Sequence, residues 1–328
     1  MPEETIKDIG EKELIKRLSY YMPNNQTSDD CGYLEIKHKK LLINTDLMVE
    51  NTHFNKNIIT AKDIGWKIAT TNFSDLISSG CDEIIGINIG LILKPDTKWK
   101  WIKDLYDGIN EALKTYGGSI IGGDCSRGDT KSISLTAIGK QGPLLLRRYS
   151  CEPGEILFTS GPHGLSKLGY LVKNDKNMKN KLAIPTELIE SAINAFSRPK
   201  PKLQTLKNIV SSKKESNKNQ VGCTDSSDGL YQALLDLSYE SKCNAVIDYN
   251  KLPKDENWPK GKNWDEYYLF GGEDYEILFS LPREWANNLL KIDNNVKEIG
   301  FLEEGNGTIK IENCPYDDLL STKPFRHF

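Results

Sequence analysis

The sequence predicts an α/β or α+β protein of two domains, and three observations lead to this fold class. The chain has 328 residues, enough for two ordinary domains, and 38% of them are hydrophobic, enough for two cores. Runs with helical periodicity alternate with strand-like runs in both halves. Turn-forming residues gather near residue 150, where Pro153-Gly154 precedes a new apolar run. We therefore place the domains at residues 1–150 and 151–328.

The first half is predicted to mix three helices with five strands. We expect helices at residues 11–22 and 60–79, the second with Thr60 as its N-cap. A third helix is indicated by one apolar face that ends at Gly117-Gly118 and consists of Leu105, Ile109, Ala112, Leu113 and Tyr116. Strands are expected at residues 33–36, 40–46, 83–93, 119–122 and 132–139.

The second half repeats this mixture. A strand is expected at residues 155–160, directly after the turn at Pro153-Gly154. A helix at residues 229–241 should turn Leu230, Leu234 and Leu237 inward. Further strands are predicted near Ala245 and at residues 275–280.

Composition excludes several classes of function. The formal net charge is −3 and lysines are scattered among acids, so we expect no nucleic-acid partner. No window approaches the roughly 18 apolar residues of a membrane span, and no signal-like segment opens the chain, so we predict a cytoplasmic protein without membrane contact. Seven dispersed cysteines without C-x-x-C spacing predict reduced thiols rather than disulfides or zinc sites.

Aspartates stand where predicted elements end. They are Asp29, Asp30, Asp46, Asp75, Asp124, Asp225 and Asp228. Taken singly, each is also explained as a solvated surface acid or a helix cap. Several adjoin apolar runs or tight turns, however, and charges close to a core need counter-ions. Mg²⁺ suits such a set, because it takes oxygen ligands and commonly combines one or two carboxylates with substrate phosphates.

Glycines beside two of these acids point to phosphate chemistry. In Gly122-Gly123-Asp124 and in Asp228-Gly229, small residues would let main-chain N–H groups approach a polyphosphate. The chain has no G-x-x-x-x-G-K-[ST] sequence and no protein-kinase motif set. A nucleotide site would therefore be built in another way.

Taken in order, these residues resemble the thiamine-monophosphate kinase family of the aminoimidazole-ribonucleotide-synthetase-like superfamily, from about Ser28 to Phe328. The matching motifs are Asp29-Asp30, Asn44-Thr45-Asp46 with Val49-Glu50 and His53-Phe54, Asn72-Phe73-Ser74-Asp75, Gly122-Gly123-Asp124, Arg148 before Pro153-Gly154, Asp225-Ser226-Ser227-Asp228-Gly229-Leu230 and Gly271-Gly272-Glu273-Asp274-Tyr275-Glu276. Departures from the family pattern occur at Ser28, Cys125 and Tyr149, and none of them removes a carboxylate.

The resemblance implies a Mg²⁺-dependent transfer of the ATP γ-phosphate to thiamine monophosphate. It implies several Mg²⁺ ions held by Asp30, Asn44, Thr45, Asp46, Asp75, Asp124, Asp225 and Asp228. ATP contacts would come from Gly123, Asp124, Arg148 and Ser227, and substrate contacts from His53, Glu273 and Phe325. An N-terminal α/β domain would hold most of the metal and phosphate site and pair its sheet with a second subunit, giving a homodimer. A C-terminal α/β domain would cover the nucleotide and contribute to the substrate site.

The chemistry explains why such residues are needed. Both reacting phosphates are anionic, so cations must neutralise the transferring group, and a phosphate monoester with a second pKa near 6 needs no strong base. We therefore assign catalysis to Asp75, Asp124, Arg148 and Asp228, acting by position and charge in a direct in-line transfer. The cationic thiazolium ring suits Phe325 and Glu273.

Individual residues also have simpler explanations. His53 would serve equally well in a structural hydrogen bond, and Arg148 beside Arg147 as a solvated basic pair. Asp225 and Asp228, three apart at the start of a predicted helix, match a cap followed by a first-turn acid as well as a shared metal cluster.

Other functions stay open at the level of the sequence. Selenophosphate synthetase and aminoimidazole ribonucleotide synthetase would share the fold, although no reactive Cys-Gly sequence precedes Asp29, and His53-Phe54 favours the thiamine enzyme. A nucleotide sensor that binds Mg²⁺-ATP without turnover is a further class. It would show nucleotide-stimulated partner binding and no product.

Overall fold

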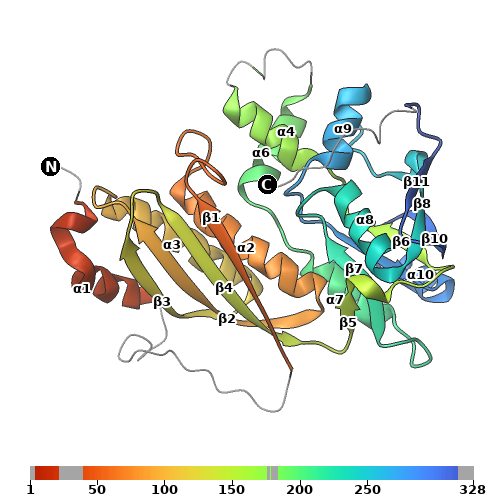
Figure 1. The fold of residues 1–328 in the computed structure, drawn as a ribbon, viewed down its shortest axis with the longest axis horizontal. Coiled ribbons are helices and arrows are strands. Elements are labelled where there is room, and N and C mark those ends of the chain that lie inside the picture. Colours follow the sequence, from red (N-terminus) through yellow and green to blue (C-terminus); the bar gives the residue numbers. More distant parts are fainter. Residues whose placement is uncertain (1–3, 22–39, 176–177, 179–183, 317–328) are drawn as a thin grey trace. The chain divides into compact units, whose positions relative to one another are not determined.

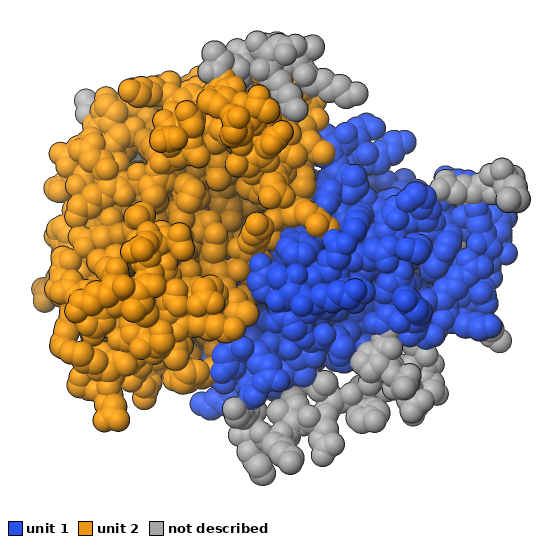
Figure 2. All heavy atoms as spheres, turned by 180° about the vertical axis from the view of Figure 1, so that it is seen from behind, with its two compact units in different colours: residues 1–76, 81–141 blue, residues 77–80, 142–328 orange. Residues whose placement is uncertain are grey.

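The computed structural model describes residues 4–21, 40–175, 178 and 184–316. It divides into two compact units, coloured separately in Figure 2. Unit 1 comprises residues 1–76 and 81–141, and unit 2 comprises residues 77–80 and 142–328. The chain passes into unit 2 at Gln141 and Gly142, before the turn residues near 150 that predicted the boundary. The predicted strand at 33–36 lies outside the described residues.

Unit 1 is a four-stranded sheet with two long helices (Figure 1). The strand order is β1-β4-β2-β3, with β2 and β3 parallel and the other neighbours antiparallel. Its elements are α1 (Ile6–Leu18), a 3₁₀ turn η1 (Ser19–Tyr21), β1 (Leu41–Val49), α2 (Ala61–Ser78), β2 (Cys81–Leu93), α3 (Trp99–Tyr116), β3 (Ser119–Arg127) and β4 (Ser132–Gln141).

Helix α2 begins where the sequence predicted. The Thr60 hydroxyl accepts the Asp63 N–H at 3.1 Å and donates to the Asp63 carboxylate at 2.7 Å, which satisfies a main-chain donor that the helix itself leaves open. Helix α3 buries the predicted apolar face, including Leu105, Ile109 and Leu113. Both predictions are confirmed because their signals are local.

Helices α2 and α3 cross at two glycines. A Cβ added to Gly65 would lie 1.9 Å from the Leu105 carbonyl oxygen, and one added to Gly108 would lie 1.8 Å from the Lys62 carbonyl oxygen. The two main chains therefore touch with no side chain between them. This contact sets the distance between α2 and α3.

The two faces of this sheet differ. Side chains alternate along a strand, and α2 and α3 cover the face on which β2 places Ile87, Ile89 and Leu91. No helix of unit 1 among its described residues covers the other side, which we call the open face. It exposes large apolar side chains, with Ile43 at 63% and Leu47 at 60% of full exposure, together with Leu41 and Ile92.

Unit 2 is built on a seven-stranded mixed sheet in the order β11-β8-β10-β6-β9-β7-β5. Its strands are β5 (Leu145–Arg147), β6 (Ile156–Thr159), β7 (Gln220–Asp225), β8 (Cys243–Asp248), β9 (Ile277–Leu281), β10 (Lys297–Glu304) and β11 (Ile309–Glu312). Its helices are η2 (Arg148–Ser150), α4 (Leu165–Asn174), α6 (Thr186–Ser197), α7 (Leu203–Ser212), α8 (Leu230–Ser241), η3 (Tyr249–Lys251), α9 (Lys262–Phe270) and α10 (Arg283–Leu289).

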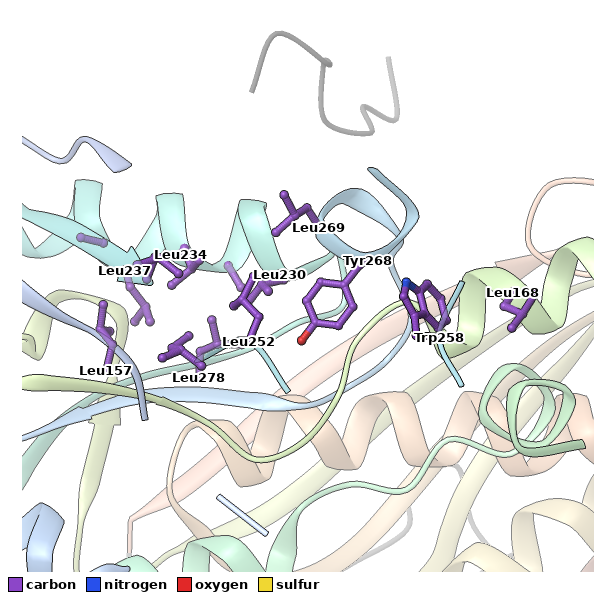
Figure 3. Close-up of a cluster of buried hydrophobic side chains, with 14 of the residues drawn as sticks. Leu157, Leu168, Leu230, Leu234, Leu237, Leu252, Trp258, Tyr268, Leu269 and Leu278 are labelled. Carbon is purple, nitrogen blue, oxygen red and sulfur yellow. The ribbon is translucent and has the colours of Figure 1, made fainter. Parts of the chain in front are cut away.

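The core of unit 2 lies between this sheet and the helices that pack on it. Figure 3 shows Leu230, Leu234 and Leu237 projecting from α8 into this cluster, as predicted, with Leu157 and Leu278 among their neighbours. With a mixed sheet in each unit, the predicted α/β fold class is confirmed. Among the described residues, no helix is both long and apolar enough to cross a bilayer. The described cysteines are free thiols.

Candidate active site

Hydrogen bonds between predicted ligand residues join β1 to α2. The Asn44 amide donates to the Asp75 carboxylate at 2.9 Å and to the Asn72 side-chain oxygen at 3.1 Å. Asn72 in turn donates to the Ile68 carbonyl at 2.8 Å, which fixes its orientation within the helix. Strand β1 and helix α2 thus bring one amide and one carboxylate of the predicted ligand set into contact.

The place where Asn44 meets Asp75 fits a Mg²⁺ ion. The Asn44 side-chain oxygen is buried and has no hydrogen-bond partner, a costly state that a cation would relieve. The side-chain oxygens of Asn44 and Asp75 are of the type that Mg²⁺ requires, but Asn44 directs its NH₂ group at Asp75, so its amide must rotate before its oxygen shares an ion with Asp75. The described residues contain no group of three or more His, Cys, Asp or Glu side chains that could hold a metal. Mg²⁺ needs no such group, because it keeps several waters and shares substrate phosphates.

Other predicted ligands of unit 1 lie further apart. Asp46 shares the helix-covered face with Asn44, since the two are two residues apart on β1. Thr45 points to the open face, where its hydroxyl meets that of Thr136 at 2.8 Å. Asp124 lies on β3, and two strands separate β3 from β1, about 14 Å at a strand spacing of about 4.8 Å. One copy of the chain does not bring Asp124 beside Asp46.

Gly123 has a structural reason to be glycine. A Cβ at this position of β3 would lie 2.2 Å from the Ile89 main-chain oxygen on β2. Close strand packing therefore explains the residue without a nucleotide. Its predicted contact with ATP stays a prediction.

His53 lies in a tight turn after β1. Its ring Nδ1 accepts the Val49 N–H at 3.1 Å, and its main-chain N–H donates to the Val49 carbonyl at 2.8 Å. Because Nδ1 acts as an acceptor, the neutral ring carries its proton on Nε2. The side chain itself is exposed. The turn therefore presents an N–H donor in a fixed tautomer.

Glu50 ties this turn to the sheet. Its carboxylate lies 2.8 Å from the Lys94 Nζ and 2.8 Å from the Lys131 Nζ, and its side chain is only 9% exposed. Burial opposes ionisation, but the hydrogen bonds with Lys131 and Lys94 outweigh it and lower the pKa of Glu50 to about 2. The sequence motif contained Glu50, but nothing local marked its two partners.

In unit 2, Asp225 and Asp228 occupy a strand-to-helix turn. Asp225 ends β7 and is 4% exposed, whereas Asp228 is exposed just before α8. The Ser227 hydroxyl donates to the Asp225 carboxylate at 3.2 Å. Neither aspartate is part of the helix, which begins at Leu230, so the helical spacing considered for this pair does not apply.

Arg148 lies beside the same strand. Its Nε donates to the Thr224 hydroxyl at 3.0 Å, and a terminal nitrogen lies 3.7 Å from the Asp236 carboxylate on α8. The side chain is 53% exposed. Arg148 is therefore held through the Nε of its guanidinium group while about half of its side chain stays exposed, in contrast with a simple solvated pair with Arg147.

The segment 271–276 packs against the Asp225–Asp228 turn. The Glu273 N–H donates to the Ser227 carbonyl at 2.7 Å, and the Glu276 carbonyl accepts the Ser226 N–H at 2.8 Å. Glu273 and Tyr275 both have left-handed main chains, with φ of 68° and 52°. Such conformations are strained for non-glycine residues and are often found at functional sites. The structure thus brings Glu273, Ser227 and Asp225 together.

Asp274 connects segment 271–276 to the start of α4. Its carboxylate accepts the Gly164 N–H at 2.6 Å and the Ser166 N–H at 2.9 Å, at the first turn of α4. Burial raises the pKa of Asp274 to about 7, and these two bonds oppose the rise. The sequence motif contained Asp274 but did not reveal this role, because its partners lie about a hundred residues away.

Two predicted site residues, Asp30 and Phe325, lie outside the described residues, as does Asp29.

Comparison with known proteins decides the family. A family model described as "AIR synthase related protein, N-terminal domain" matches residues 28–141. The thiamine-monophosphate kinase of Prochlorococcus marinus is 40% identical over 326 residues, covering 99% of this chain and 98% of that protein. The chain belongs to the thiamine-monophosphate kinase family.

Further matches agree with this family. The thiamine-monophosphate kinase of Synechococcus elongatus is 30% identical, with 100% of this chain and 99% of that protein covered. The solved structure of AaThiL complexed with AMPPCP and TMP has a TM-score of 0.74 at 28% identity, and 98% of each chain is covered. These full-length matches favour the thiamine-monophosphate kinase family over the selenophosphate and aminoimidazole ribonucleotide synthetases.

Proposed function

We propose that this protein transfers the γ-phosphate of ATP to the phosphate of thiamine monophosphate, giving thiamine diphosphate and ADP. An acceptor oxygen forms a new bond to the γ-phosphorus, and the bond from that phosphorus to the β,γ-bridging oxygen breaks as ADP leaves. The observation that carries the proposal is the 40% identity to a thiamine-monophosphate kinase over almost the whole chain. The AaThiL complex supports it, because AMPPCP is ATP with a methylene in place of that bridging oxygen.

The chain's residues supply position and charge. Asn44 and Asp75 would hold one Mg²⁺ ion, and the predicted ligands of further Mg²⁺ ions are Asp30, Thr45, Asp46, Asp124, Asp225 and Asp228. Bound Mg²⁺ would neutralise phosphate charge and align the two substrates. Arg148, whose Nε donates to the Thr224 hydroxyl, would place a permanent positive charge beside the nucleotide phosphates.

We assign the substrate contacts to residues of both domains. The Nε2–H of His53 is suited to donate to an acceptor on thiamine monophosphate, and Glu273 to attract the thiazolium ring. Gly123 and Ser227 are assigned to ATP, and Phe325 to the substrate. We assign most metal ligands to residues 1–150 and further nucleotide and substrate contacts to residues 151–328. The cytoplasmic location stays a prediction from the sequence.

The decisive assay follows thiamine diphosphate by chromatography after incubation of the protein with Mg²⁺-ATP and thiamine monophosphate. We expect product from wild type, none with free thiamine as acceptor, and at least a 10²-fold lower rate for Asp75→Asn, the order reported for loss of a preorganised transition-state contact. Asp82→Asn, an exposed aspartate of the same sheet, is the matched control and should keep full activity. ATP binding without any product would refute the kinase and favour the nucleotide sensor.

We also propose a homodimer that forms through the open face of unit 1. Four large apolar side chains are exposed there, and contiguous apolar surface of this kind marks protein contacts. Thr45 and Asp124 lie on the same face, so predicted ligands would border the interface.

Light scattering tests the dimer. Wild type should have twice the mass of one chain, and Ile43→Glu with Leu47→Glu should yield monomers. Ile292→Glu, an apolar residue of unit 2 that is 53% exposed, should leave the mass unchanged. A monomeric wild type would refute this assembly.

A further inference from the structure

The turn that carries His53 is held by an unusual combination of bonds. Its main chain closes on itself, with the Asn51 N–H donating to the Phe54 carbonyl at 2.8 Å and Asn51 in a left-handed conformation at φ 69°. The Glu50 N–H donates to the Lys131 carbonyl at 2.9 Å. The turn is therefore compact, and the bond from Glu50 connects its base to the sheet.

Glu50 makes the charged part of that connection. It directly follows β1, Lys94 directly follows β2 and Lys131 directly precedes β4, so one buried carboxylate joins the ends of three strands. Lys131 also lies 5.4 Å from the centre of the Trp101 ring on α3, and Trp101 packs near Phe54. The carboxylate thus connects the base of the turn to the end of β2 and the start of β4.

Packing holds the turn through Phe54, which is 4% exposed and whose ring centre lies 6.4 Å from that of Trp101. Other residues of the turn border a cavity of about 520 Å³, whose lining includes Glu50, Asn51, Asn55, Lys94, Lys131 and Trp101. At this cavity, Glu50 holds the base of the turn through its ion pairs with Lys94 and Lys131. We therefore expect the position of the turn to change when these ion pairs are lost.

We propose that Glu50 is a positioning residue for substrate recognition, which it controls through the turn that presents His53. Glu50 does not contact the substrate itself. It fixes the end of β1, and this keeps the Val49 N–H aimed at Nδ1 of His53 and the proton of the ring on Nε2. This inference rests on the proposed function for its kinetic consequence, but not for its structural one.

The kinetic test replaces Glu50 with Gln, which keeps the shape and removes the charge. We expect the KM for thiamine monophosphate to rise about tenfold, since small displacements of a binding group cause losses of up to about 10²-fold. The KM for ATP and kcat should stay within about twofold of wild type. Glu83→Gln is the matched control, because Glu83 pairs with Lys140 between β2 and β4 of the same sheet, and its kinetics should match wild type.

A double-mutant cycle separates positioning from general damage. In a His53→Ala background, Glu50→Gln should produce almost no further rise in KM, because its effect acts through His53. A full further rise in that background would overturn the proposal. So would an unchanged KM with a lower kcat, since that pattern indicates partial unfolding rather than misplacement.

The structural test does not depend on the reaction. In ¹⁵N-labelled protein, the ring signals of His53, assigned by their loss in His53→Ala, should show an unprotonated Nδ1 and a protonated Nε2. Glu50→Gln should mix the two tautomers, and Glu83→Gln should not. If wild type makes no thiamine diphosphate, the proposed function fails while this test still decides the inference. Mixed tautomers in wild type, or no change in Glu50→Gln, would overturn it.

Discussion

The crossing of α2 over α3 offers a sharp test of how the metal-ligand pair is placed. Alanine at Gly108 would set its Cβ 1.8 Å from the Lys62 carbonyl oxygen, and alanine at Gly65 would meet the Leu105 carbonyl oxygen at 1.9 Å. Contacts below 3.0 Å are essentially never found, so the helices must separate by about 1.2 Å, the difference between 3.0 and 1.8 Å. Helix α2 carries Asp75, so a shift of α2 would alter the contact between Asp75 and Asn44 on β1.

The loss of unfolding free energy in these alanine variants follows from two opposing effects. Overpacking costs about 1–3 kcal/mol, and the upper end applies because each clash is with helix main chain. Alanine regains up to about 1 kcal/mol of helix propensity over glycine. Each single variant should therefore lose about 2 kcal/mol. In the double variant, the second methyl group enters a gap that the first has opened, so the total should be well below the additive value of about 4 kcal/mol.

Urea unfolding followed by circular dichroism gives the free energies, and hydrogen exchange locates the loss in α2 and α3. Gly90→Ala in β2 is the control, because its Cβ would meet only the Ser134 Cβ at 3.4 Å. Mg²⁺ affinity should fall in the single variants as the contact between Asp75 and Asn44 is altered. Stable single variants, or a double variant that loses the full sum, would refute this account of the crossing.

Three further predictions follow from buried groups. The pKa of Glu50 is lowered from 4.5 to about 2, which corresponds to about 3 kcal/mol of stability that is present above pH 4.5 and lost as the pH falls through about 2. The difference in unfolding free energy between wild type and Glu50→Gln should shrink over that range, and a constant difference would contradict the ion pairs. The pKa of Asp274 is raised to about 7, so its stabilising effect is fully present below 3.8 and is lost as the pH rises through about 7. The thermal midpoint of Asp274→Asn should lack this decline between pH 5 and 8, and parallel curves would argue against a buried carboxyl. Leu230→Ala, at a fully buried position of α8, should lower stability in urea by about 3 kcal/mol, and a loss below about 1 kcal/mol would show that the core closes around the gap.

Local signals in the sequence predicted most of the elements. The Thr60 cap, the apolar face of α3 and the leucines of α8 each depend on residues within a few turns of one another, so periodicity was sufficient. The first helix begins at Ile6 rather than residue 11. Its start is marked by Thr5, whose hydroxyl and N–H both donate to the Asp8 carboxylate, a signal that the apolar pattern alone does not contain.

Long-range order was not predictable in the same way. The order β1-β4-β2-β3 does not follow the chain, and it places two strands between β3, which carries Asp124, and β1, which carries Asp46. The partners of Glu50 and Asp274 come from distant segments, so no spacing in the sequence identifies them. Asp75 was a candidate ligand from the pattern of aspartates, and Asn44 from the family motif alone. The structure adds that the Asn44 side-chain oxygen is buried without a hydrogen-bond partner.

The short segment 77–80 affects the order in which unit 2 can fold during synthesis. It belongs to unit 2, although the residues on either side of it belong to unit 1. There the Gly142 N–H donates to the Gly80 carbonyl and Arg147 donates to the Ser79 carbonyl, so its partners leave the ribosome more than sixty residues later. Because synthesis adds about 5–20 residues per second, several seconds pass between the synthesis of residues 77–80 and that of their partners. A fragment that starts at residue 142 would lack this segment altogether, so unit 2 becomes whole only when both parts of the chain are present.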